Sequence, residues 1–108
     1  MRRYEGRREG YVADVTVDGR PLNPRLDLWN HSPTGFEWGY GGSGPAQLAL
    51  AILADHLNDD ERALVFYQRF KWSVIAELPK KGWTLTGAEI EQAIHAIRVQ
   101  ETRVGGAA

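Results

Sequence analysis

The residues with the clearest chemical potential lie in a glycine-rich stretch, 38–45, that contains four glycines, a serine and a proline. An apolar run follows it as far as Leu57. A helix that begins here would present unpaired N–H groups and a partial positive charge to a ligand. One hypothesis is therefore a site for an anion or a nucleotide phosphate at this turn. Its candidate residues are Tyr40, Gly41, Gly42, Ser43, Gly44 and Gln47.

The same glycines also have a purely structural interpretation, which we favour. The stretch lacks the GK[ST] ending of a Walker loop, and no parallel strand follows it, as a dinucleotide fingerprint would require. A sharp turn into a helix that packs closely on a sheet needs glycine for positive φ and for close approach. In this interpretation Ser43 or Gly44 is the N-cap, Pro45 fits the first turn and Gln47 folds back toward the cap.

Catalytic and metal-binding patterns are poor. His31, His56 and His95 are far apart in the sequence and form no HxxxH or HxH spacing. Ser43 lacks the GxSxG elbow of a serine nucleophile. There is no cysteine, which excludes disulfides and thiolate ligands. We expect a non-enzymatic protein that has no metal site and no cofactor.

Trp72 is the aromatic residue that the pattern sets apart. It lies near Arg69 and Lys71, beside the polar face expected for its helix. An exposed Trp beside basic residues favours a partner surface formed by Arg69 and Trp72, because Trp and Arg are enriched in interfaces. The alternative, which we favour, is a half-buried Trp that shields the edge of the core. A protein partner or a homodimer is the partner class that this surface favours.

Four arginines near the N-terminus, Arg2, Arg3, Arg7 and Arg8, suggest a weaker hypothesis of nucleic-acid binding. Phosphate-binding arms carry a net positive charge, whereas Glu5 and Glu9 interrupt this cluster and the chain has a formal charge of −1. The alternative is a short edge strand, in which charged side chains prevent edge-to-edge pairing. We favour the edge strand over the nucleic-acid hypothesis.

The elements that would position these residues form an α+β pattern. Residues 1–10 and 11–17 read as strands, and in the second strand Tyr11, Ala13, Val15 and Val17 alternate toward the core. Asp18-Gly19 favours a hairpin turn. Residues 26–29 resume the alternation, and residues 36–40 would form the last strand of an antiparallel meander.

Three helices are expected to follow the strands. The first, at about 44–57, is apolar almost all round and would be central. The second, at about 59–78, would begin with a capping box at 58–61, and the third with a capping box at 86–89. We therefore expect an α+β domain with a sheet of three or four strands and three helices packed on one of its faces.

The length of 108 residues fits a single domain, which we place at 1–104 with a flexible tail at 105–108. The longest apolar run is too short to span a bilayer, and no apolar segment follows the first arginines. We expect a small soluble cytoplasmic protein without a membrane partner.

The stretch from Phe36 to Leu53, FEWGYGGSGPAQLALAIL, resembles the hallmark of a family of domains of unknown function, number 6166, from bacteria, archaea and phages. The resemblance extends from the Tyr4-Glu5-Gly6-Arg7 start to the region 83–86. It implies no activity, cofactor or catalytic residue. The occurrence of the family on mobile elements implies an accessory role, such as interference with host defence.

Overall fold

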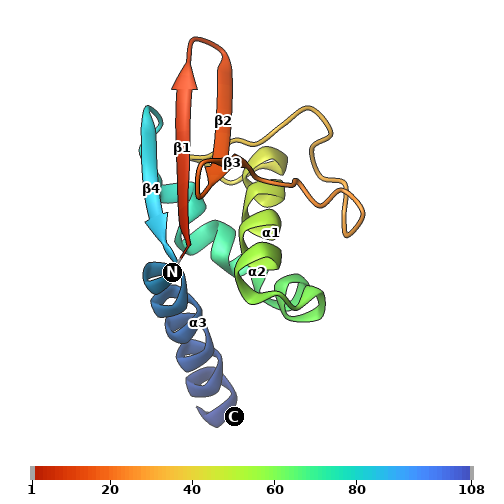
Figure 1. Cartoon of the computed structure of the whole chain (residues 1–108). Helices are drawn as coiled ribbons and strands as arrows, with labels where there is room; N and C mark the ends of the chain where they lie inside the picture. The colour runs from red at the N-terminus through yellow and green to blue at the C-terminus, as the bar shows by residue number, and fades with distance from the viewer. Residues whose placement is uncertain (1, 108) are drawn as a thin grey trace.

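A computed structural model describes the backbone of residues 2–107 and the side chains of residues 2–101. Its elements follow one another in the order β1 (Arg3–Glu9), β2 (Val12–Val17), β3 (Arg20–Pro21), α1 (Ser43–Leu57), α2 (Asp60–Ser73), a 3-10 turn η1 (Ile75–Glu77), β4 (Gly82–Thr86) and α3 (Gly87–Ala107) (Figure 1). The expected α+β class, with an antiparallel sheet and three helices, is confirmed.

The sheet has four strands in the order β3-β2-β1-β4, and all neighbours are antiparallel. β1 is therefore a central strand, and our expectation of an edge strand at residues 1–10 is wrong. Its second neighbour, β4, lies more than seventy residues later in the sequence, beyond two helices. Local charge patterns carry no information about a strand that arrives from so far away.

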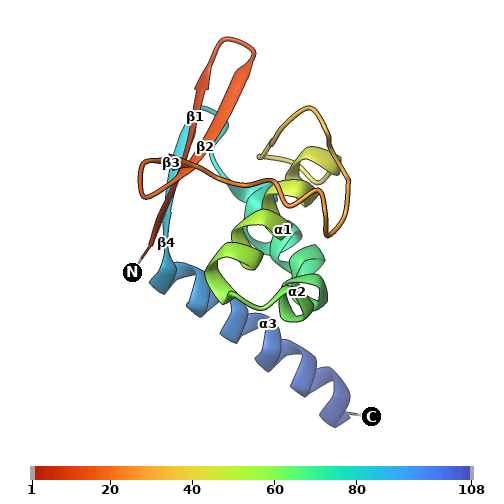
Figure 2. The same cartoon turned by 45° about the vertical axis from the view of Figure 1, so that its right-hand side comes forward.

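The two faces of the sheet differ sharply. Tyr4, Val15 and Leu85 are buried on the face toward α1. The side chains that alternate with them, such as those of Arg7 and Asp14, lie on the open face. Figures 1 and 2 show α1 and α2 on one side of the sheet, and α3 leading away from the end of β4.

The hairpin between β1 and β2 turns at Gly10 and Tyr11, because Glu9 pairs directly with Val12. Tyr11 is consequently fully exposed at the hairpin tip, so its expected core position is wrong. The positive φ of 59° at Gly10 fits a tight two-residue connection. Val15 is buried as expected, because the alternation along the strand begins only after the turn.

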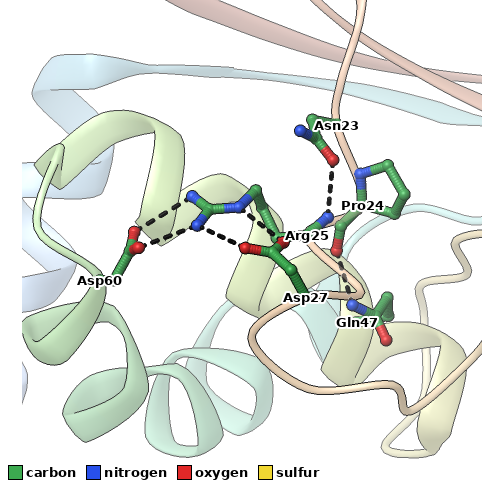
Figure 3. A network of polar contacts seen from close by, with 6 residues as sticks. All are labelled: Asn23, Pro24, Arg25, Asp27, Gln47 and Asp60. Atoms are coloured by element: carbon green, nitrogen blue, oxygen red, sulfur yellow. Dashed lines mark hydrogen bonds and ion pairs between the residues drawn. The ribbon is translucent and has the colours of Figure 1, made fainter.

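Residues 22–42 form a long loop, so the strands expected at 26–29 and 36–40 are absent. Specific side chains hold this loop in place (Figure 3). Arg25, at φ 55°, donates to Asp27 in its own turn and to Asp60 at the start of α2. Trp38 is fully buried and meets the Trp83 ring edge-on at a centroid distance of 5.6 Å. Long-range contacts therefore override the short alternation that suggested strands.

The helices agree with the sequence more closely than the strands do. α1 begins one residue before the expected start and is buried on nearly all sides. Its N-cap is Gly42, without a side-chain hydrogen bond, so a cap at Ser43 or Gly44 is wrong. At α2 the cap is Asp59, whose carboxylate accepts from Arg62 N, and the capping box expected at 58–61 is absent.

α3 starts with the expected capping box, in which Glu89 N donates to Thr86 Oγ1 and Thr86 N donates to Glu89 Oε1. Its inner residues Ile90, Ile94 and Ile97 are buried. The helix extends to Ala107, three residues into the segment where we expected a tail, and residue 108 lies outside the described part. None of the helices within residues 2–107 has the length and apolar character that a membrane crossing requires.

Candidate functional site

Three glycines of the glycine-rich turn face side chains that leave no room for a Cβ atom. A Cβ at Gly41 would overlap the ring of Trp72. At Gly42 it would lie 2.6 Å from the Tyr40 ring, and at Gly44 it would lie 2.7 Å from Cβ of Glu37. Packing of neighbouring side chains therefore accounts for these glycines, and the turn joins the loop 22–42 to α1.

Gln47 belongs to this packing and lies outside the ligand-accessible surface, because its exposed fraction is 0%. Its Oε1 accepts hydrogen bonds from the backbone N–H groups of His31 and Ser32, at 2.7 and 3.1 Å. Its Nε2 donates to the carbonyl of Pro24 at 2.6 Å (Figure 3). Gln47 therefore ties both ends of the 24–32 segment to α1 and has no polar atom left for a ligand.

A cleft of about 710 Å³ lies on the other side of the same turn. Its volume falls in the range of ordinary ligand pockets. One wall is the hairpin, and the facing wall comes from the loop and the first turn of α1. The lining residues are 11–15, Pro21, Leu22, Ser32, residues 34–37, Tyr40, Ser43 and Gly44. Of the candidate turn residues, Tyr40, Ser43 and Gly44 thus reach the cleft.

The charges around this cleft are balanced. Arg8 donates to both carboxylate oxygens of Glu37, at 2.6 and 3.1 Å, and it lies 4.8 Å from the centroid of the Trp38 ring. Hydrogen bonding to the Arg8 guanidinium holds the pKa of Glu37 below its usual value. Asp14 contributes backbone to the cleft, because its position in β2 directs its side chain to the open face of the sheet. Glu37 therefore adds no uncompensated negative charge to the cleft.

The hairpin wall of the cleft contains an unpaired strand edge. β3 pairs with β2 only at Thr16 and Val17, and the last contact is the hydrogen bond from Leu22 N to Val15 O. Because Val15 directs its backbone groups away from β1, Ala13, two residues earlier, does the same. The chain leaves the sheet after Leu22, and the cleft occupies the place where a continued β3 would lie.

The opposite wall offers hydrogen-bond donors at the helix start. The first intrahelical bond of α1 runs from Ala46 N to Gly42 O. Within the described part of the chain, no acceptor pairs with the N–H groups of Ser43 and Gly44, which line the cleft. Free N–H groups at the start of a fifteen-residue helix attract an anionic group.

A second cluster lies on the Gly41 side of the turn, where Trp72 is 59% exposed. Lys71 Nζ lies 4.5 Å from the centroid of the Trp72 ring. His31 Nε2 lies 2.8 Å from the Tyr67 hydroxyl, and the pKa of His31 is lowered by burial and by the nearby charge of Lys71. The other residue of the expected partner surface, Arg69, forms an ion pair with Glu101 of α3.

Lys71 is the residue of this cluster that the sequence analysis missed, because we considered Lys71 as a basic neighbour of Trp72. It follows Tyr67 by four residues, and this spacing places both side chains on one helix face. Tyr67 is buried, so the spacing was the signal that Lys71 points inward.

The four N-terminal arginines do not form one basic surface. Arg2 pairs with Asp55 of α1 at 2.6 Å, and Arg8 pairs with Glu37 toward the cleft. Arg3 and Arg7 are exposed, and Arg7 approaches Glu5. Each of the three paired arginines has a carboxylate neighbour that partly neutralises it. Among residues 2–101, moreover, no group of three His, Asp or Glu side chains could hold a metal ion.

The chain therefore combines an α+β fold with a cleft beside the start of α1. A family described as a family of unknown function (DUF6166) matches residues 4–96. The chain belongs to this family, and the resemblance carried by the glycine-rich motif is confirmed. No curated protein and no solved structure matches the chain.

Proposed function

We propose that this protein is a non-enzymatic interaction module that binds the carboxyl-terminal segment of a partner protein in the cleft. The segment would lie extended and add a strand to the free edge of β2. The observation that carries the proposal is the position of the cleft, which begins where β3 leaves β2. Strand addition to an exposed sheet edge is a recurring mode of peptide recognition.

The backbone of β2 supplies the affinity in this mode. Ala13 directs its N–H and its carbonyl into the cleft, and Val15 offers its N–H beside the carbonyl that Leu22 already uses. Each net hydrogen bond contributes roughly 0.5–1.5 kcal/mol. The rings of Phe36 and Tyr40 line the facing wall, where alternate side chains of the segment would pack.

The first turn of α1 supplies the specificity for a chain end. The N–H groups of Ser43 and Gly44 would donate hydrogen bonds to the terminal carboxylate, which would take the place of the anion that the glycine-rich turn first suggested. The ion pair of Arg8 with Glu37 would keep the carboxylate of Glu37 from repelling it. In this proposal, the anion at the turn is the terminal carboxylate of the peptide, and anion binding is not a separate function.

A binding role is preferred to an enzymatic one because the cleft places no base beside a nucleophile. Ser43 Oγ makes no hydrogen bond to any side chain within residues 2–101, whereas a serine nucleophile needs a base within reach. An accessory role on a phage or mobile element, which the family resemblance implies, would act through the same peptide contact.

The test selects binders from a displayed library of random octapeptides with free carboxyl ends and measures them on four variants. Ala13→Pro removes one outward N–H without breaking the pairing with β1, and Asp14→Ala on the other face is its control. Ser43→Pro removes one helix N–H at the first helical position, where proline is well tolerated. Its control, Ser43→Ala, keeps that N–H.

We expect Ala13→Pro and Ser43→Pro each to weaken binding by about tenfold, and both alanine controls to bind like the wild type. Amidation of the peptide end should weaken binding to the wild type more than binding to Ser43→Pro, which keeps only the Gly44 N–H. Addition of peptide should slow exchange of the Ala13 amide. Peptides that bind Ala13→Pro as well as the wild type would refute strand addition, and concentration-dependent dimers without peptide would assign the edge to a second copy instead.

A further inference from the structure

Lys71 is a buried cation without an acceptor. Its exposed fraction is 9%, and it is one of two buried polar or charged side chains in residues 2–101, the other being the fully bonded Gln47. No hydrogen bond or carboxylate partner of Lys71 occurs within the described side chains; its contacts are the Trp72 ring and the charge felt by His31. Buried ammonium groups are normally paired, because desolvation disfavours an unpaired charge.

The neighbours of Lys71 place it close to the segment that leads into α1. The Trp72 ring that lies 4.5 Å from Lys71 Nζ also covers the backbone of Gly41, two residues before α1 starts. His31, on the other side, is bonded through its backbone to Gln47 in the second turn of α1. These contacts place Lys71 beside the segment that leads into α1.

The ammonium is also accessible from solvent. Within residues 2–101, the side-chain nitrogen that is both sealed from solvent and without an acceptor is Trp83 Nε1. Lys71 Nζ has no acceptor among these residues but is not fully sealed, so the ammonium keeps some contact with solvent. The exposed ring of Trp72 borders this access.

We propose that Lys71 binds the phosphate group of a small phosphomonoester at a site beside Trp72. This site is separate from the peptide cleft, whose lining includes neither Lys71 nor Trp72. The phosphate oxygens would accept the free N–H bonds of the ammonium, and the ammonium would offset the negative charge of the phosphate. The Trp72 ring would border the remainder of the ligand, where a planar group could stack.

The test measures thermal shifts and NMR titrations with four probes: inorganic phosphate, ribose 5-phosphate, AMP and adenosine. We expect the three phosphates to stabilise the protein and shift the resonances of Trp72 and Gly41, while adenosine does neither. Stronger binding of AMP than of ribose 5-phosphate would show that a base stacks on Trp72, and equal binding would show that the phosphate alone is recognised. Both results support the site, whereas adenosine binding as well as AMP would overturn it.

The matched variants are Lys71→Met, which keeps the length of the side chain, and Lys71→Arg, which keeps its charge. We expect Lys71→Met to lower phosphate affinity by about tenfold or more, and Lys71→Arg to retain most of it. Equal phosphate affinity of Lys71→Met and the wild type would overturn the proposal.

A measurement on the unmodified protein provides an independent check. The titratable groups that face His31 in the described structure are Tyr67 and Lys71, both on α2. A bound phosphate would offset the charge of Lys71, so the pKa of His31 should rise when phosphate is added. An unchanged His31 titration at saturating phosphate would place the ion elsewhere and overturn the site.

Discussion

Replacement of Gln47 by leucine tests how the loop 22–42, which forms one wall of the cleft, is held in place. Leucine is close to glutamine in size, so Gln47→Leu fills the same space in a fully buried position. It removes the acceptor of the N–H groups of His31 and Ser32 and the donor to the carbonyl of Pro24. Gln47→Leu therefore removes three hydrogen bonds while it keeps the volume of the buried side chain.

The expected loss follows from the number and burial of these bonds. Each net hydrogen bond contributes roughly 0.5–1.5 kcal/mol, and a buried group left without a partner costs more, roughly 1–3 kcal/mol. His31 and Ser32 are partly exposed, so water can replace some of what they lose. We expect Gln47→Leu to lower the free energy of unfolding by about 2–4 kcal/mol, out of roughly 5–15 kcal/mol for a typical domain.

The assay is urea unfolding followed by fluorescence, with amide hydrogen exchange at His31 and Ser32 as the local readout. Ser43→Ala is the control, because it lies in the same helix and its hydroxyl has no hydrogen-bond partner among the described side chains; we expect a change within about 0.5 kcal/mol. Gln47→Leu should also abolish the exchange protection of both loop amides. A loss below about 1 kcal/mol with unchanged exchange would show that packing, and not Gln47, positions the loop.

Two further predictions concern the cleft walls. Gly44→Ala should destabilise the protein although alanine favours helices, because its Cβ would lie 2.7 Å from Cβ of Glu37; a higher melting temperature would contradict this packing. Arg8 lowers the pKa of Glu37 in the folded protein, so the ionised carboxylate stabilises the fold. This stabilisation is fully present above the unfolded pKa of about 4.3 and is lost as the pH falls through the lower, folded pKa. Between pH 6 and pH 3, the free energy of unfolding in urea should therefore fall less for Glu37→Gln than for the wild type. An equal fall for both proteins would refute this contribution of Glu37.

Several elements could be predicted because neighbouring residues determine them. The apolar run that ends at Leu57 predicted α1, and the capping box from Thr86 to Glu89 predicted the start of α3. Asp18 and Gly19 both adopt positive φ, of 50° and 81°, as the hairpin signal required. Capping, helical periodicity and two-residue turns act over a few residues, so the sequence displays them directly.

The errors arose where distant segments compete with a local pattern. Alternation at 36–40 suggested a strand, but Trp38 is drawn into the core against Trp83. The charges of β1 suggested an edge, but β4 pairs along its far side. The capping box at 58–61 failed because Asn58, at φ 51°, ends α1 instead of starting α2. In each case burial or pairing with a distant residue outweighed a weak local preference.

The sequence by itself determined the class of this protein, its central helix and the glycine-rich turn by which its family is identified. Only the tertiary structure decided what surrounds that turn: Trp72 and Tyr40 pack against it, and a cleft with an open strand edge lies beside Ser43. It also decided that Gln47 is bonded to the loop and that Lys71 is buried with no acceptor among the side chains that the structure describes. The physical reason is that helix starts and turns are local, whereas clefts and buried charges depend on which distant segments meet.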